Sequence, residues 1–185
     1  MREILLDLEL LKSPILHLPD LQLDGVPFGV TTDSFPRHKI TEVSFSPIVA
    51  RSCSGTDIKL EYYDSAGQQL SFDAVIDSVI ATNGIVHFPS KISFKIAAGR
   101  VVGFALYGDH LRRFEYLRTY EDFCAAFGSA DRVVVNEAYG DLMGYDHFFF
   151  QSRKHVAWDA FAERVNLINL GEYDGNSSVD SATVA

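Results

Sequence analysis

Alternating apolar and polar residues recur along the second half of the chain and predict β-strands. Residues 92–96 alternate strictly, residues 97–99 (Ala-Ala-Gly) suit a turn, and residues 100–106 return as a half-buried strand. Further strand patterns occupy residues 132–135, 147–150, 154–158 and 164–170. We therefore expect a meander of antiparallel strands.

One segment between these strands has the marks of a helix. Thr119 and Asp122 stand at capping-box spacing, and Phe123 and Phe127 lie four residues apart on one helical face. Gly128 is placed to end the helix in a left-handed conformation. The pattern predicts a helix over residues 120–127.

The first half of the chain is less regular. Residues 58–62 and 69–72 alternate around a turn at 64–67 and predict a hairpin. Residues 74–80 have apolar pairs four apart, as in a helix, but their β-branched content favours a strand, which is our prediction. Asn83-Gly84 then predicts a hairpin turn into residues 85–88.

The N-terminal segment, residues 4–23, is rich in leucine but is broken by Pro14 and Pro19, so only short strands or helical turns are expected there. Asp24-Gly25 suits a hairpin turn. The small, polar residues 174–185 predict a disordered tail. Together these patterns predict one α+β domain over residues 1–173, mainly an antiparallel meander sheet with one or two short helices.

Two stretches, Tyr62–Gly84 and Phe149–Gly171, share an order of parts. Each begins with aromatic residues, passes a polar turn, reaches an aromatic-Asp pair and closes on an apolar run before glycine. The order leaves open an internal duplication. Two unrelated meanders would also share this turn chemistry and alternation.

Composition narrows the classes of partner. The chain has 185 residues with 25 acidic and 16 basic side chains, a formal charge of -9, which disfavours nucleic acid and anionic membranes. A basic partner would be attracted, although such a charge also serves solubility alone. The 14 Phe and 8 Tyr residues against one Trp suit strands packed with aromatic rings.

The location predicted for the protein is the cytoplasm. Cys53 and Cys124 are the only cysteines and form neither a disulfide framework nor a zinc-binding pattern. The first nine residues mix acids with apolar residues, unlike a signal peptide, and no apolar run approaches the length of a membrane span.

Catalytic motifs are missing from the sequence, so we expect no enzyme, no cofactor and no metal. There is no Gly-x-Ser-x-Gly and no phosphate-binding glycine loop. Asp109-His110 and Asp146-His147 are adjacent pairs, which point to opposite faces on a strand. His147 and His155 could face each other across a hairpin near Ser152, which leaves a small enzyme with a His/Asp metal site as an alternative.

The segment from Tyr139 to Asp146, which we expect to form a loop, has the composition of a protein interface. It combines tyrosines, aspartates, a Leu-Met pair and flexible glycines. The alternative is an ordinary strand connection with its aromatic residues turned inward. The predicted partner-binding residues are Asp141, Leu142, Met143, Tyr145, Asp146, Glu172, Tyr173 and Asp174.

Residues 91–173 resemble small cytoplasmic immunity proteins encoded beside bacterial polymorphic toxins. The resemblance is carried by the hairpin at 92–106, by residues 117–123 through Phe127-Gly128, and by residues 156–158 and 165–171. The helix, Phe-Gly and sheet order is also similar to the repeat of β-lactamase-inhibitor-type domains, which usually have a proline where this chain has Ser129-Ala130-Asp131.

The resemblance to immunity proteins implies inhibition by binding. The expected partner is a cognate protein toxin with a basic surface, and no catalytic residue is carried over. A protein-interaction domain whose partner is not a toxin remains open as an alternative.

Overall fold

The computed structural model describes residues 1–44, 49–53 and 59–172, without the side chains of 49–53, 59 and 60. Backbone contacts divide the chain into two compact units, which are described separately below. Unit 1 comprises residues 1–28 and 103–185, and unit 2 comprises residues 29–102. The single domain over residues 1–173 stays a prediction.

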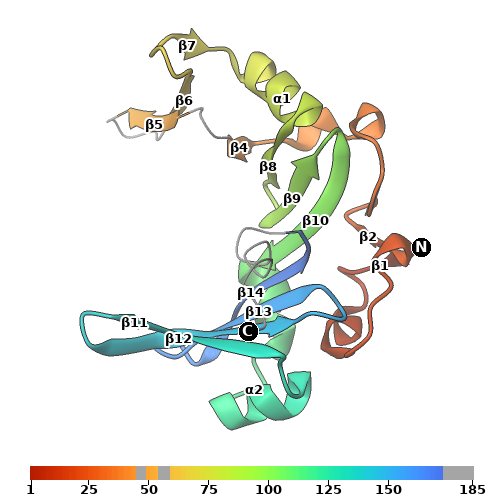
Figure 1. The fold of residues 1–185 in the computed structure, drawn as a ribbon, viewed down its shortest axis with the longest axis vertical. Helices are drawn as coiled ribbons and strands as arrows, with labels where there is room; N and C mark the ends of the chain where they lie inside the picture. The colour runs from red at the N-terminus through yellow and green to blue at the C-terminus, as the bar shows by residue number, and fades with distance from the viewer. Residues whose placement is uncertain (45–48, 54–58, 173–185) are drawn as a thin grey trace, which may run out of the picture. The chain divides into compact units, whose positions relative to one another are not determined.

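The main sheet confirms the predicted α+β class. It has eight strands in the hydrogen-bonded order β11-β12-β13-β14-β10-β9-β8-β4. Strands β11 to β14 follow one another as antiparallel neighbours, which is the expected meander (Figure 1). Strand β10 contributes residues to both units, since the division falls after Val102.

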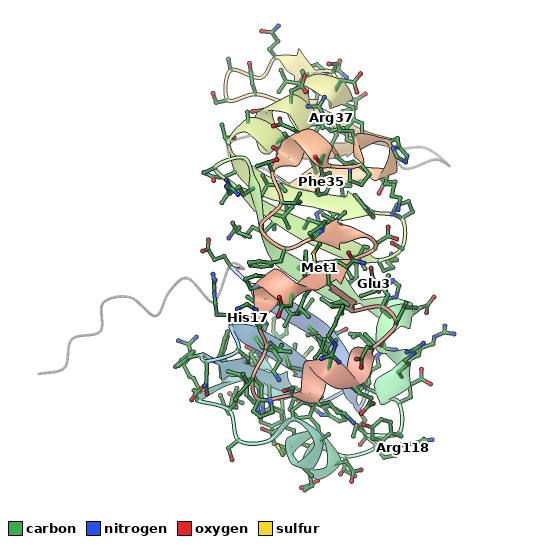
Figure 2. All side chains as sticks on the ribbon, turned by 90° about the vertical axis from the view of Figure 1, so that its right-hand side faces the viewer. Met1, Glu3, His17, Phe35, Arg37 and Arg118 are labelled. Atoms are coloured by element: carbon green, nitrogen blue, oxygen red, sulfur yellow. The ribbon has the colours of Figure 1, made fainter. Side chains whose placement is uncertain are left out.

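Unit 1 begins with a small three-stranded sheet and two short 3-10 helices. The carboxylate of Glu3, which Figure 2 labels, accepts hydrogen bonds from the backbone N–H groups of Asp24 (3.0 Å) and Gly25 (2.9 Å). It therefore fixes the predicted turn between β2 and β3. Ile4, Leu11 and Leu23 are fully buried. The elements are β1 (Arg2–Glu3), η1 (Leu8–Lys12), η2 (Leu18–Asp20), β2 (Leu21–Leu23) and β3 (Val26–Pro27).

The rest of unit 1 is the meander with its helix α2 (Tyr120–Phe127), and the predicted helix is confirmed. The Thr119 side chain accepts from the Asp122 N–H, the Asp122 carboxylate accepts from the Thr119 N–H, and Gly128 has φ +78°. The other elements are β10 (Arg100–Tyr107), η5 (Gly108–Phe114), β11 (Arg132–Ala138), β12 (Asp141–Phe149), β13 (Lys154–Asp159) and β14 (Arg164–Gly171).

Unit 2 contains the predicted hairpin of β6 and β7 and the remaining strands of the main sheet. Phe35, which Figure 2 labels, packs edge-on against Phe88 and Phe94 in the core of this unit. Its elements are η3 (Thr32–Ser34), η4 (Arg37–Lys39), β4 (Glu42–Ser44), β5 (Val49–Cys53), β6 (Lys59–Tyr63), β7 (Gln69–Leu70), α1 (Phe72–Ala81), β8 (Asn83–Phe88) and β9 (Ile92–Ala97).

The strand predicted over residues 74–80 is wrong, because these residues belong to helix α1. The Ser71 side chain caps the helix by accepting from the Ala74 N–H. Val75 and Val79 are fully buried on one face. Burial of that helical face outweighs the modest preference of β-branched residues for strands.

The hairpin turn predicted at Asn83-Gly84 is also wrong. The residues before it are helical, so there is no preceding strand to pair, and Asn83 and Gly84 begin β8 instead. A Cβ atom on Gly84 would lie 2.9 Å from the Ser44 oxygen, which explains the glycine by close approach of β4.

Helix α1 also makes the two stretches considered for duplication structurally different. Residues 72–81 are helical in the first stretch, whereas residues 164–171 form strand β14 in the second. The two stretches therefore differ in the order of their elements.

Candidate functional site

The pairing of β12 with β13 gives the meander two chemically different faces. His147 stands opposite Val156, and Phe148 stands opposite His155. Directly opposed residues share a face, and neighbours along a strand alternate. His147 therefore lies on the face that contacts α2, here called the α2 face, and His155 lies on the other, here called the Asp146 face.

This arrangement rules out the alternative in which His147 and His155 face each other, because they lie on opposite faces. Within residues 1–44, 49–53 and 59–172, no group of three or more His, Cys, Asp or Glu side chains is arranged to hold a metal ion. Asp109 forms an ion pair with Arg112 at 2.8 Å in η5. The His/Asp metal site thus gains no support from the geometry.

On the α2 face, His147 belongs to an aromatic core. Its Nε2 lies 2.7 Å from the Tyr120 hydroxyl, and its ring meets Phe123 edge-on. Burial lowers the pKa of His147 and raises the pKa of Tyr120, so both groups are neutral at pH 7 and share one hydrogen bond between the hydroxyl and Nε2. Tyr145 stacks on Tyr120 with ring centroids 4.0 Å apart. These residues join α2 to the sheet.

The Asp146 face carries a chain of polar side chains from four strands. Asn136 donates to one Asp146 oxygen at 2.8 Å, and His155 Nε2 donates to the other at 2.8 Å. Asn169 donates to His155 Nδ1 at 2.9 Å, which fixes the tautomer that presents N–H to Asp146. The hydrogen bond from His155 lowers the pKa of Asp146, so this carboxylate is ionised and held in one orientation.

Beside Asp146 the sheet surface is hollowed into a groove of about 460 Å³. Asp146 and Asp159 contribute its carboxylates, and no lysine or arginine lines it. Met143 is 48% exposed and Phe161 is 90% exposed. The lining residues are Asn136, Met143, Gly144, Asp146, Ala157, Trp158, Asp159, Phe161, Asn166 and Leu167.

Exposed apolar side chains also occur near the turn of the β11–β12 hairpin, whose two strands Figure 1 shows side by side. Tyr139 is fully exposed at the two-residue turn and has φ +56°, a costly conformation for a bulky residue. Leu142 is also more than 40% exposed. Val133 and Val135 are exposed as well, but they stand opposite His147 and Tyr145 and therefore lie on the α2 face. We call the exposed side chains of Tyr139, Leu142, Met143 and Phe161 the hairpin surface.

The structure separates the predicted partner-binding residues into three groups. Asp141, Leu142 and Met143 are exposed, but they lie in strand β12 rather than in a loop. Tyr145 and Asp146 are half-buried by the contacts described above.

Glu172 pairs with Arg153 at 3.0 Å, near the opposite end of the meander from Asp141. A nine-residue strand separates these ends by roughly 25 Å. Tyr173 and Asp174 lie outside the described residues.

Of the ten groove residues, the sequence prediction included only Met143 and Asp146. It missed eight, among them Asn136, Gly144, Asp159 and Phe161. The Asp159-Ala160-Phe161 turn repeats the pairing of acid and aromatic residues seen at Asp141 to Asp146, and this signal was available in the sequence. Gly144 was predicted to be flexible, but a Cβ there would lie 2.1 Å from the Trp158 oxygen. This glycine permits close strand contact.

No family model, curated protein or solved structure matches this chain. In the part of the chain that the structure describes, no helix combines the length and apolar character needed to cross a membrane.

Proposed function

We propose that this chain is a protein-binding module that neutralises a cognate bacterial toxin by direct binding in the cytoplasm. The observation that carries the proposal is the hairpin surface, where exposed apolar side chains adjoin a groove with two carboxylates. Aromatic, methionine and aliphatic residues of this kind supply contact area in protein interfaces.

The position of these side chains supports binding rather than packing within the chain. Tyr139 occupies a strained turn conformation, and its ring is fully exposed instead of packing within the chain. Exposed apolar side chains that occur together on one surface are characteristic of interaction sites. Leu142 and Met143 lie on the paired strand β12, and Tyr139 and Phe161 lie in short turns between paired strands. This backbone is formed before the partner binds, which limits the entropy lost on binding.

A toxin as the partner is supported by the resemblance of residues 91–173 to immunity proteins. The net charge of -9 supports a basic partner surface, since opposite charge accelerates encounter. In this mechanism the protein covers the toxin's active surface and supplies no reactive group of its own.

Co-expression with the product of the adjacent gene tests this function. We expect that gene product to arrest growth, the protein to restore growth, and the two to co-purify. The Tyr139→Ser/Leu142→Ser double variant should lose both rescue and co-purification, because it removes two apolar contacts from the hairpin surface.

Phe150→Ser is the matched control, since Phe150 is 44% exposed just beyond the other end of β12. It should rescue like the unmodified protein. A non-toxic neighbour, or rescue by the double variant equal to that by the control, would overturn the proposal. Co-purification with a non-toxic partner would instead support an interaction domain of another kind.

A further inference from the structure

We propose that the groove beside Asp146 receives an arginine or lysine side chain from an extended basic segment of the partner. This inference rests on the proposed protein-binding function and specifies the chemistry of the bound segment. In this inference the groove binds the cationic side chain of the partner, and the hairpin surface binds the apolar residues next to it.

The charge of the groove is the first support. Its lining contains Asp146 and Asp159 and no cationic side chain. Arg164 stands opposite Asp159 in the β13–β14 pairing but lines a different concavity, with Asp109 and Arg112. A cation in the groove would therefore meet two carboxylates without a competing positive charge from its lining.

Both carboxylates are already oriented. Asp146 is held by Asn136 and His155, one donor to each oxygen. Asp159 accepts the backbone N–H groups of Phe161 (3.0 Å) and Ala162 (2.8 Å) through one oxygen. Its other oxygen has no partner among the described residues and is free to accept from a guanidinium or ammonium group.

The apolar residues at the groove suit the remainder of such a side chain. Met143 can pack against the methylene stem, and the exposed ring of Phe161 can stack on a guanidinium plane. A volume of about 460 Å³ lies within the range of small-ligand pockets and accommodates one long side chain with its flanking backbone.

A second copy of this chain is a poor occupant. Each copy carries a charge of -9, so self-association would bring like charges together. A basic segment has the opposite charge. The residues that flank its bound arginine or lysine can contact the apolar side chains of the hairpin surface.

The test measures binding of a labelled peptide that alternates Arg and Thr, with a Gln-for-Arg peptide of equal length as the uncharged comparison. We expect the Arg peptide to bind at low ionic strength and the Gln peptide to bind at least about tenfold more weakly. Asp159→Asn should weaken Arg-peptide binding about tenfold, since the amide retains the turn-forming oxygen and loses the charge. Phe161→Ala should weaken it about threefold.

Glu121→Gln is the control, because it removes an equal charge from the exposed first turn of α2, away from the groove lining. It should bind the Arg peptide like the unmodified protein. Equal binding by Asp159→Asn and Glu121→Gln would overturn the inference and indicate diffuse attraction to an acidic surface. Thermal unfolding of each variant verifies that the fold is retained.

The two proposals fail in different ways. If Asp159→Asn still rescues growth and binds the Arg peptide as well as Glu121→Gln does, the inference about the groove fails and toxin neutralisation stands. If no toxin is neutralised, the proposed function fails whatever the peptide does.

Discussion

A single buried lysine shows how one residue connects distant parts of unit 1. Lys154 is 1% exposed, and its Nζ donates to the backbone oxygens of Leu11 and Ser13 at 2.9 Å each. Its ammonium also lies 4.5 Å from the centre of the Phe149 ring. Lys154 thus supplies donors to carbonyls at the end of η1 that the short helix leaves unpaired.

The lysine should make stability rise with pH in the alkaline range. Burial lowers the pKa of Lys154 to about 8 from its ordinary 10.5. Below about pH 8 both states hold the proton; above it the native state releases the proton while the unfolded chain keeps it until about pH 10.5. Lys154 should therefore add about 2 kcal/mol of stability between about pH 7.5 and about pH 9.5.

Urea unfolding of the protein and of Lys154→Met at these two pH values measures the contribution. Methionine retains an unbranched apolar stem and removes the titrating group. The variant should show the smaller gain in unfolding free energy with pH. An identical gain in both proteins would contradict the role assigned to Lys154.

At the scale of elements, the two helices show which local signals are decisive. Helix α2 has a capping box, an apolar face and a terminal glycine that all agree, and its bounds follow from the sequence. Helix α1 has an apolar face but β-branched side chains, so local preference and periodicity disagree. Packing resolves that disagreement, since the buried face gives more stabilisation than the strand preference opposes.

The cap of α2 leads to a direct prediction for this element. Thr119→Ala should lower the free energy of unfolding by about 1 kcal/mol, because the Asp122 N–H loses its acceptor. Thr119→Ser should restore most of the loss, since serine keeps the hydroxyl. Chemical denaturation checks both variants, and equal stability of alanine and serine at this position would refute the capping role.

At the scale of the whole molecule, net charge governs encounter with a partner. A protein of charge -9 attracts basic segments over a distance set by ionic strength. Contacts inside the groove form only after the partner segment has bound, so they affect its dissociation rate. Association and dissociation should therefore respond differently to salt.

The association rate of the Arg peptide should fall about tenfold or more between about 0.01 M and 0.5 M salt, with a smaller change in dissociation rate. Stopped-flow fluorescence measures both rates. The Gln peptide, which carries no charge, provides the comparison. An association rate that is insensitive to salt would exclude long-range attraction.

The sequence by itself determined the local elements of this protein. Helix α2, the turn at Asp24-Gly25 and the strands β9, β10, β13 and β14 follow from caps, turn residues and alternation. Interactions over a few residues set these features, so a short window of sequence contains the necessary information. Strand β12 begins at Asp141, six residues before the predicted strand. The segment Asp141 to Asp146 was also recognised as unusual, although as a loop.

Only the tertiary structure decided what these elements present to a partner. The strand register places Asp146 beside His155 and separates His155 from His147. The β13–β14 turn brings Phe161 into the same groove as Met143. Shifting a strand by one residue would reverse its faces, and the register depends on contacts between residues far apart in the chain, which no local pattern encodes.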